Sequence, residues 1–211
     1  MNAEVHPSAI VDRSAKLGPG VAIGPYSVIG PGVEIGDGNT IREYVTINRG
    51  TTHDVGVTRV GNDNWIMAYV HFAHDCQIGN HTIFANACQL AGHVTVGDWA
   101  IFGATTLVHQ FVHIGAHAFT GMGTYLPQDL PPYVTAAGNM AQPYGINSEG
   151  LKRRGFSPEA IAGLKRAYRT LYRSGLGLEE ARLQLESQVA ACPQVREFLE
   201  FLARSKRGII R

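Results

Sequence analysis

The sequence has few cysteines and no long apolar run. Its 211 residues contain three cysteines, Cys76, Cys88 and Cys192, whose spacing fits neither an even set of disulfides nor a metal motif. Unpaired thiols are typical of a reducing compartment. No apolar run approaches the roughly eighteen residues of a membrane span, and no signal segment follows Met1. We therefore expect a soluble cytoplasmic protein without stable membrane insertion.

The chain also lacks a strong net charge, and its +1 argues against a nucleic-acid partner. The charge is unevenly distributed, however. Residues 1–147 carry five Lys/Arg against ten Asp/Glu, whereas residues 148–211 carry thirteen against seven. The basic tail suits an anionic partner or anionic ligand groups, although a solvated helical face would give the same pattern.

An apolar residue recurs at every sixth position of the chain. The main series starts at Val60 and continues through Ile66, Phe72, Ile78, Phe84, Leu90, Val96, Phe102, Val108 and Ile114. An earlier series runs from Val5 to Ile47 with the same spacing. Neither a helix nor an ordinary strand has this period, but hexapeptide repeats do. They predict a left-handed parallel β-helix in which three hexads form one triangular coil, so that residues about eighteen apart stack.

Interruptions of the series predict the boundaries. It fails at His53 and resumes at Val60 one step out of phase, and Thr120 breaks it again near its end. Ser157-Pro158-Glu159 then supplies the N-cap, N1 proline and first-turn acid of a helix. We expect a β-helix over residues 1–133 with a loop excursion at 49–59, an irregular crossing over 134–147, and a small C-terminal α-helical domain over 148–211.

Three histidines point to a site on one side of three consecutive coils. His74, His93 and His109 fall in hexads that begin eighteen residues apart. A neutral imidazole is the natural general base for a hydroxyl, and Asp75 could orient His74. The bare backbone N–H of Gly92 could stabilise an oxyanion. Together these groups indicate direct acyl transfer from a thioester to an alcohol, with no covalent intermediate.

Other readings of the same histidines stay open. Corners of a β-helix can carry polar histidines without function, and the three residues could share a zinc ion. The spacing of His109, His113 and His117 by four would suit ligands on a helix, but the six-residue series continues through this region. We therefore expect no metal site from that spacing.

Several motifs resemble one known family over nearly the whole chain. They are His71-Phe-Ala-His74-Asp75-Cys76, Leu90-Ala-Gly92-His93-Val94, Val108-His109-Gln110-Phe111, Pro131-Pro132-Tyr133-Val134, Asn147-Ser-Glu149-Gly150-Leu151-Lys152-Arg153-Arg154-Gly155-Phe156 and Ala203-Arg204-Ser205-Lys206-Arg207-Gly208-Ile209-Ile210-Arg211. Their sequences are similar to those of UDP-N-acetylglucosamine O-acyltransferases. The resemblance implies a homotrimer that needs no cofactor and takes the first step of lipid A biosynthesis.

The reaction implied by the resemblance moves an R-3-hydroxyacyl chain from acyl carrier protein to the glucosamine 3-hydroxyl of UDP-N-acetylglucosamine. By motif, His74 is the general base, Asp75 its orienting partner and Gly92 the backbone donor to the thioester carbonyl. The residues implied to bind substrate are His71, His93, His109, Gln110, Asn147, Glu149, Arg153 and Arg154.

Two departures from the family pattern bear on function. Between Asp37 and Ile41 the family carries roughly two further coils and a loop that help bind substrate. Met122 occupies the position that limits acyl-chain length, and its bulk predicts a preference for chains near ten carbons. The alternatives are a related acyltransferase acting on another nucleotide sugar or amine, and a shortened non-catalytic paralogue.

Overall fold

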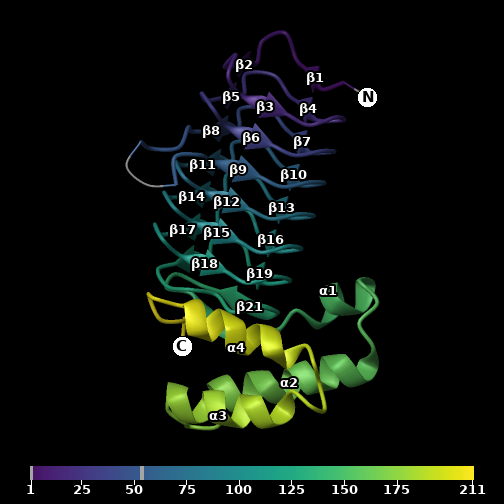
Figure 1. Cartoon of the computed structure of the whole chain (residues 1–211), viewed down its shortest axis with the longest axis vertical. Coiled ribbons are helices and arrows are strands. Elements are labelled where there is room, and N and C mark those ends of the chain that lie inside the picture. Colours follow the sequence, from purple (N-terminus) through teal and green to yellow (C-terminus); the bar gives the residue numbers. More distant parts are fainter. Residues whose placement is uncertain (1, 53–54) are drawn as a thin grey trace.

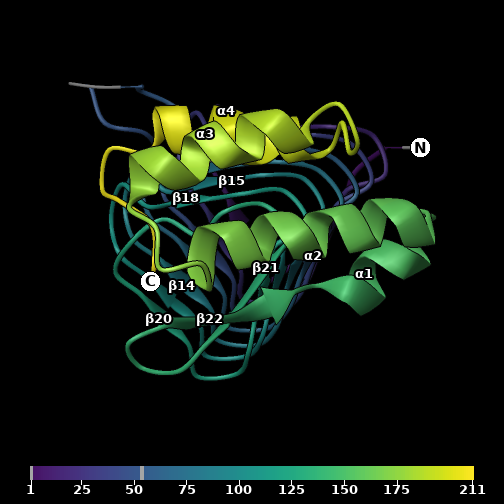
Figure 2. The same ribbon diagram turned by 90° about the horizontal axis from the view of Figure 1, so that it is seen from below.

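The computed structural model describes residues 2–52 and 55–211, so Met1, His53 and Asp54 lie outside the description. The described chain is a left-handed parallel β-helix followed by helices that pack against one end of the prism (Figures 1 and 2). None of the helices in this part of the chain has the length and apolarity needed to cross a membrane.

Three parallel sheets form the sides of the prism, and most of their strands are two residues long. The first sheet contains β1 (Glu4–Val5), β4 (Ala22–Ile23), β7 (Thr40–Ile41), β10 (Trp65–Ile66), β13 (Ile83–Phe84), β16 (Ile101–Phe102) and β19 (Phe119–Thr120). The second contains β2 (Ile10–Val11), β5 (Val28–Ile29), β8 (Thr46–Ile47), β11 (His71–Phe72), β14 (Gln89–Leu90), β17 (Leu107–Val108) and β20 (Tyr125–Leu126). The third contains β3 (Lys16–Leu17), β6 (Glu34–Ile35), β9 (Arg59–Val60), β12 (Gln77–Ile78), β15 (Thr95–Val96) and β18 (His113–Ile114).

The pairing register confirms the predicted coil. Glu4 pairs with Ala22 and Trp65 with Ile83, eighteen residues apart in each case. Across the segment between β8 and β9 the register becomes 25, as in the pairing of Glu34 with Arg59. Seven extra residues therefore leave the coil there without disturbing the stacking on either side.

The six-residue series fills the prism. From Ile23 to Ile114 its members are at most 4% exposed. The Phe84 ring stacks on Phe102 with centroids 4.5 Å apart and meets Phe72 edge to face at 4.8 Å. Thr120, where the sequence predicts a break, keeps the inward position and is 1% exposed. Its hydroxyl lies 2.9 Å from that of Thr106, which satisfies the buried polar group.

Glycines at the first position of a corner let successive coils approach. A Cβ added to Gly24 would lie 2.8 Å from the carbonyl carbon of Arg42, and one on Gly18 would lie 2.6 Å from that of Gly36. Backbone contact between coils, and not only freedom to turn, therefore explains the repeated glycine.

Two strands replace the irregular crossing expected over residues 134–147. β21 (Val134–Ala137) pairs in parallel with β19, and β22 (Gln142–Ile146) returns antiparallel to it. The prediction of an irregular segment was wrong because β21 alternates buried and half-buried residues and extends the first sheet by one strand. Pro143 lies at the irregularity in the pairing with Ala136, where a missing N–H is tolerated.

The C-terminal part contains α1 (Ser148–Arg153), α2 (Pro158–Tyr172), α3 (Leu178–Gln188) and α4 (Val195–Arg204). α2 begins as predicted, since the Ser157 side chain accepts a hydrogen bond from the N–H of Ala160. The short α1 was not predicted. Tyr133 joins this part to the prism, because its hydroxyl donates a hydrogen bond to Glu197 of α4.

We predict that the buried amides at one corner stabilise the prism. Asn64 is 2% exposed, donates to the Asn39 side chain at 2.9 Å and accepts from the Thr82 hydroxyl at 2.6 Å. Asn64→Ala should lower the free energy of unfolding by about 2 kcal/mol because it leaves buried polar groups unpaired. The exposed Asn86→Ala should change it by less than about 0.5 kcal/mol. Denaturant unfolding at a fixed protein concentration measures both, and equal losses would contradict the prediction.

Candidate active site

The candidate site lies on the corner that joins the second sheet to the third. We call residues 73–76, 91–94 and 109–112 of this corner the histidine corner. His74 and Gly92 occupy its second position in successive coils, and Asp75 and His93 occupy its third, with φ of 60° and 61°. The coil spacing therefore places His74 directly over Gly92, and Asp75 over His93.

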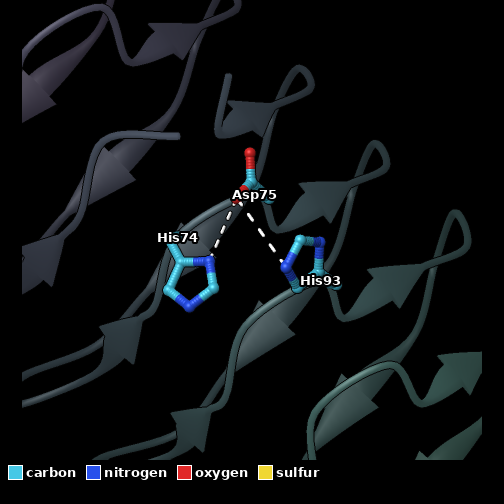
Figure 3. A group of neighbouring side chains, drawn as sticks. All are labelled: His74, Asp75 and His93. Carbon is cyan, nitrogen blue, oxygen red and sulfur yellow. Dashed lines mark hydrogen bonds and ion pairs between the residues drawn. The ribbon is translucent and has the colours of Figure 1, made fainter. Parts of the chain in front are cut away.

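His74 and Asp75 form a hydrogen-bonded dyad (Figure 3). The Nδ1 atom of His74 lies 3.0 Å from Oδ2 of Asp75. An ionised carboxylate only accepts, so the proton of a neutral His74 lies on Nδ1 and the lone pair on Nε2. The His74 side chain is 41% exposed, whereas that of Asp75 is fully buried. The arrangement presents the His74 imidazole to solvent beside a buried carboxylate.

The Asp75 carboxylate is held as an anion by hydrogen bonds from the loop excursion. Burial raises the pKa of Asp75, but hydrogen bonds from Thr51, His74 and the backbone N–H groups of Thr51 and Gly56 outweigh it and hold the pKa below its usual value. The charge that orients and stabilises an imidazolium is thus present at neutral pH.

Gly92 is required by the position of the His74 ring. A Cβ at residue 92 would lie 2.6 Å from Nε2 of His74, closer than any real side chain allows. Among the described residues, none accepts a hydrogen bond from the Gly92 N–H. A backbone donor and the basic nitrogen therefore lie at the same place on the corner, as acyl transfer requires.

The three predicted histidines share the corner but not one position in it. The His74 and His93 rings meet edge to face with centroids 5.0 Å apart, and His93 stacks on Phe111 at 4.5 Å. His109 occupies the first corner position one coil further on, where its Nδ1 donates to the Gln110 carbonyl at 3.1 Å. The structure therefore brings His74 and His93 together and sets His109 beside them.

Three side chains that could hold a metal ion lie close together at this site. Single ligand atoms of His74, Asp75 and His93 all lie within 4.8 Å of one another. Oδ2 of Asp75 already accepts from the Thr51 hydroxyl at 2.7 Å and from His74. A bound cation would have to displace the hydrogen bond that orients the base, so these groups fit acid–base chemistry better.

A groove of about 500 Å³ opens beside His74 and is lined in part by Asn48 and by Gly50 and Thr51 of the excursion. Cys76 and Cys88 supply no competing nucleophile. Burial raises the pKa of Cys76 to about 12 and that of Cys88 to about 11, so both stay protonated.

Other predicted site residues lie elsewhere on the prism. His71 faces outward from the second sheet with its Nδ1 2.7 Å from the Thr46 hydroxyl, and burial lowers its pKa. Gln110 is exposed on the histidine corner. Met122 lies on the corner between the first and second sheets, and it is 78% exposed.

The four residues implied to bind the nucleotide sugar cluster at the remaining corner. Asn147 caps α1 and donates from Nδ2 to the His117 carbonyl at 3.1 Å. The Arg154 guanidinium lies over the Trp99 ring, 5.1 Å from its centroid. Glu149 and Arg153 are exposed on α1. Within one chain the predicted residues are thus divided among all three corners.

Sequence reasoning assigned no role to two residues of the site, one in contact with His93 and one in contact with Asp75. Phe111 stacks on His93. It lies eighteen residues after His93, and this spacing could have predicted the contact. Thr51 binds Asp75 across 24 residues, from a segment outside the repeat, and no sequence signal identifies that contact.

Comparison with known proteins agrees with the fold and the motifs. A family model described as UDP N-acetylglucosamine O-acyltransferase, domain 2, matches residues 129–210, and a model of bacterial transferase hexapeptide repeats matches residues 14–49 and 58–88. A protein named acyl-[acyl-carrier-protein]–UDP-N-acetylglucosamine O-acyltransferase from Janthinobacterium is 55% identical over 162 residues, which are 75% of this chain and 62% of the relative. The counterpart from Thiobacillus denitrificans is 52% identical over 158 residues, 75% of this chain and 61% of its own length.

Solved structures agree over the whole chain. The UDP-N-acetylglucosamine acyltransferase from Bacteroides fragilis superposes with a TM-score of 0.96 at 40% identity, over 100% of this chain and 87% of that one. The Moraxella catarrhalis O-acyltransferase gives 0.87 at 34% identity, over 98% and 99%. The chain spans about 62% of the length of the curated relatives it matches. From this identity and coverage, we conclude that the chain belongs to the UDP-N-acetylglucosamine O-acyltransferase family.

Proposed function

We propose that this chain transfers an R-3-hydroxyacyl group from acyl carrier protein to the 3-hydroxyl of UDP-N-acetylglucosamine, the first step of lipid A biosynthesis. The observation that carries the proposal is the His74–Asp75 dyad, packed on Gly92 beside an open groove. The names of the curated relatives supply the substrate class. The unpaired cysteines support a cytoplasmic setting.

In the proposed mechanism Nε2 of His74 takes the proton from the sugar hydroxyl as its oxygen attacks the thioester carbonyl. Asp75 holds the imidazole and stabilises the positive charge that develops on it. The Gly92 N–H donates to the oxyanion of the tetrahedral intermediate. The C–S bond then breaks, and the imidazolium returns its proton to the departing thiolate.

We further propose that the active site forms between neighbouring copies of a homotrimer. In one chain the dyad, Met122 and Arg154 lie on three different corners, so a single prism does not gather them. A closed ring of three copies would bring the histidine corner of one subunit against another corner of the next. The basic C-terminal part suits both a pyrophosphate and an acidic carrier protein.

His74→Ala should abolish acyl transfer, with kcat falling at least about a thousandfold because the base is lost. The assay uses R-3-hydroxydecanoyl carrier protein and UDP-N-acetylglucosamine. The matched control is His6→Ala on the first coil, whose exposed ring contacts Ser8 and which should turn over normally. Turnover by His74→Ala at the wild-type rate would refute the base assignment. A well-folded wild type without turnover would favour the non-catalytic alternative.

Met122→Gly should shift the preferred donor from about ten carbons towards longer chains, because a bulky side chain no longer limits the acyl pocket. Relative kcat/KM values for ten-, twelve- and fourteen-carbon donors measure the shift. Met122→Leu keeps the bulk and should keep the preference. An unchanged preference in Met122→Gly would contradict the role of Met122.

Mixing two inactive variants tests whether the site is shared between copies. His74→Ala and Arg154→Ala should each be inactive, and refolding an equal mixture should restore about a quarter of wild-type activity by random assembly. A mixture that stays inactive, although mixed oligomers form, would place both residues in the same subunit's site.

A further inference from the structure

The buried carboxylate of Asp75 is held mainly by residues that lie outside the repeating coil. The Thr51 N–H lies 3.1 Å from both carboxylate oxygens, and the Thr51 hydroxyl donates to Oδ2 at 2.7 Å. The Gly56 N–H donates to Oδ1 at 2.9 Å. The coil itself contributes the His74 hydrogen bond and a longer contact, with Nε2 of His93 3.9 Å from Oδ2. The seven residues inserted into the corner therefore supply the environment of the anion.

Close backbone packing at the base of the excursion sets these donors in place. A Cβ added to Gly50 would lie 2.1 Å from the Val57 nitrogen, so only glycine allows the two sides of the loop to meet. Gly56 adopts a φ of 76°, which also favours glycine. The Asp75 N–H donates to the Thr58 hydroxyl at 2.9 Å, which ties the end of the excursion to the same residue.

We propose that Thr51 is a positioning residue that fixes the rotation of the Asp75 carboxylate, and through it the tautomer of His74. This inference rests on the proposed function, in which His74 is the general base. Oδ2 accepts from Thr51 and from His74 at once, so the hydroxyl holds the oxygen where Nδ1–H meets it. Thr51 acts through Asp75 and has no direct part in the proton transfer.

The hydroxyl matters because a second imidazole also faces the same carboxylate oxygen. Nε2 of His93 is 3.9 Å from the same oxygen, so a rotated carboxylate would turn from His74 towards His93. An imidazole without a partner for Nδ1 prefers to carry its proton on Nε2. That tautomer of His74 has no lone pair facing the substrate and cannot act as the base.

Kinetics test the role first. Thr51→Val keeps the shape and the backbone N–H but removes the hydroxyl, and we expect kcat to fall about tenfold with KM unchanged. Thr51→Ser should restore kcat to within about twofold of the wild type because it returns the donor. Thr40→Val, on the exposed face of β7, is the matched control and should leave both constants unchanged. A rise in KM with kcat unchanged would overturn the proposal, since it would mean that Thr51 binds substrate.

A double-mutant cycle separates positioning from a general structural effect. If Thr51 acts only through the carboxylate, Thr51→Val should have no further effect in an Asp75→Asn background. The same tenfold loss in both backgrounds would overturn the proposal. Unfolding measurements on each variant keep stability apart from rate.

A spectroscopic measurement tests the proposal without relying on turnover. Imidazole ¹⁵N chemical shifts of His74, in protein labelled at histidine, should show the Nδ1–H tautomer in the wild type and in Thr51→Ser. In Thr51→Val they should move towards the Nε2–H tautomer. Equal tautomer populations in the wild type and Thr51→Val would overturn the role of Thr51. Absence of turnover in the wild type would instead refute the proposed function, and the shifts would still decide whether Thr51 holds the dyad.

Discussion

The stacking of each coil on the next is the constraint from which the rest of the structure follows. The two-residue strands from β1 to β20 pair with one another at a separation of eighteen residues, or 25 across the excursion. An inward apolar residue on every strand then buries a continuous core, as in other repeat proteins. Because this register fixes the backbone, each corner side chain lies next to the corners of the adjacent coils. The His74 contacts with Gly92 and His93 arise in this way.

Each position within a corner imposes a different condition on its side chain. The first often admits only glycine, because the next coil approaches closely, while the third adopts a left-handed conformation that Asp75 and His93 accept. The second lies between them, and its side chain can cross to the neighbouring coil when that coil has a glycine. A base, its orienting anion and a backbone donor therefore come together on a rigid surface without any long-range rearrangement.

The repeat allowed most of the fold to be predicted, because a six-residue period has few physical explanations. The same count of eighteen residues predicted the histidine corner but not the position of each residue within it. The structure accordingly places His109 beside the dyad, where the sequence predicted it in one column with His74 and His93. The strands over 134–147 were missed because glycines and prolines obscure their alternation. Thr51 could not be found from the sequence, since its contact with Asp75 depends on how a non-repeating segment folds back.

The seven extra residues in the segment between β8 and β9 also bear on how such a chain can change in length. Adding or removing about eighteen residues at once keeps all three sheets in register, whereas any other length must be accommodated at a corner. A corner insertion leaves the buried series intact and costs only the entropy of closing a loop, which grows slowly with its length. Chain length along the prism therefore changes in steps of about eighteen residues, whereas insertions of any length can be placed at its corners. In evolution, the corners can gain residues such as Thr51 while the buried core is preserved.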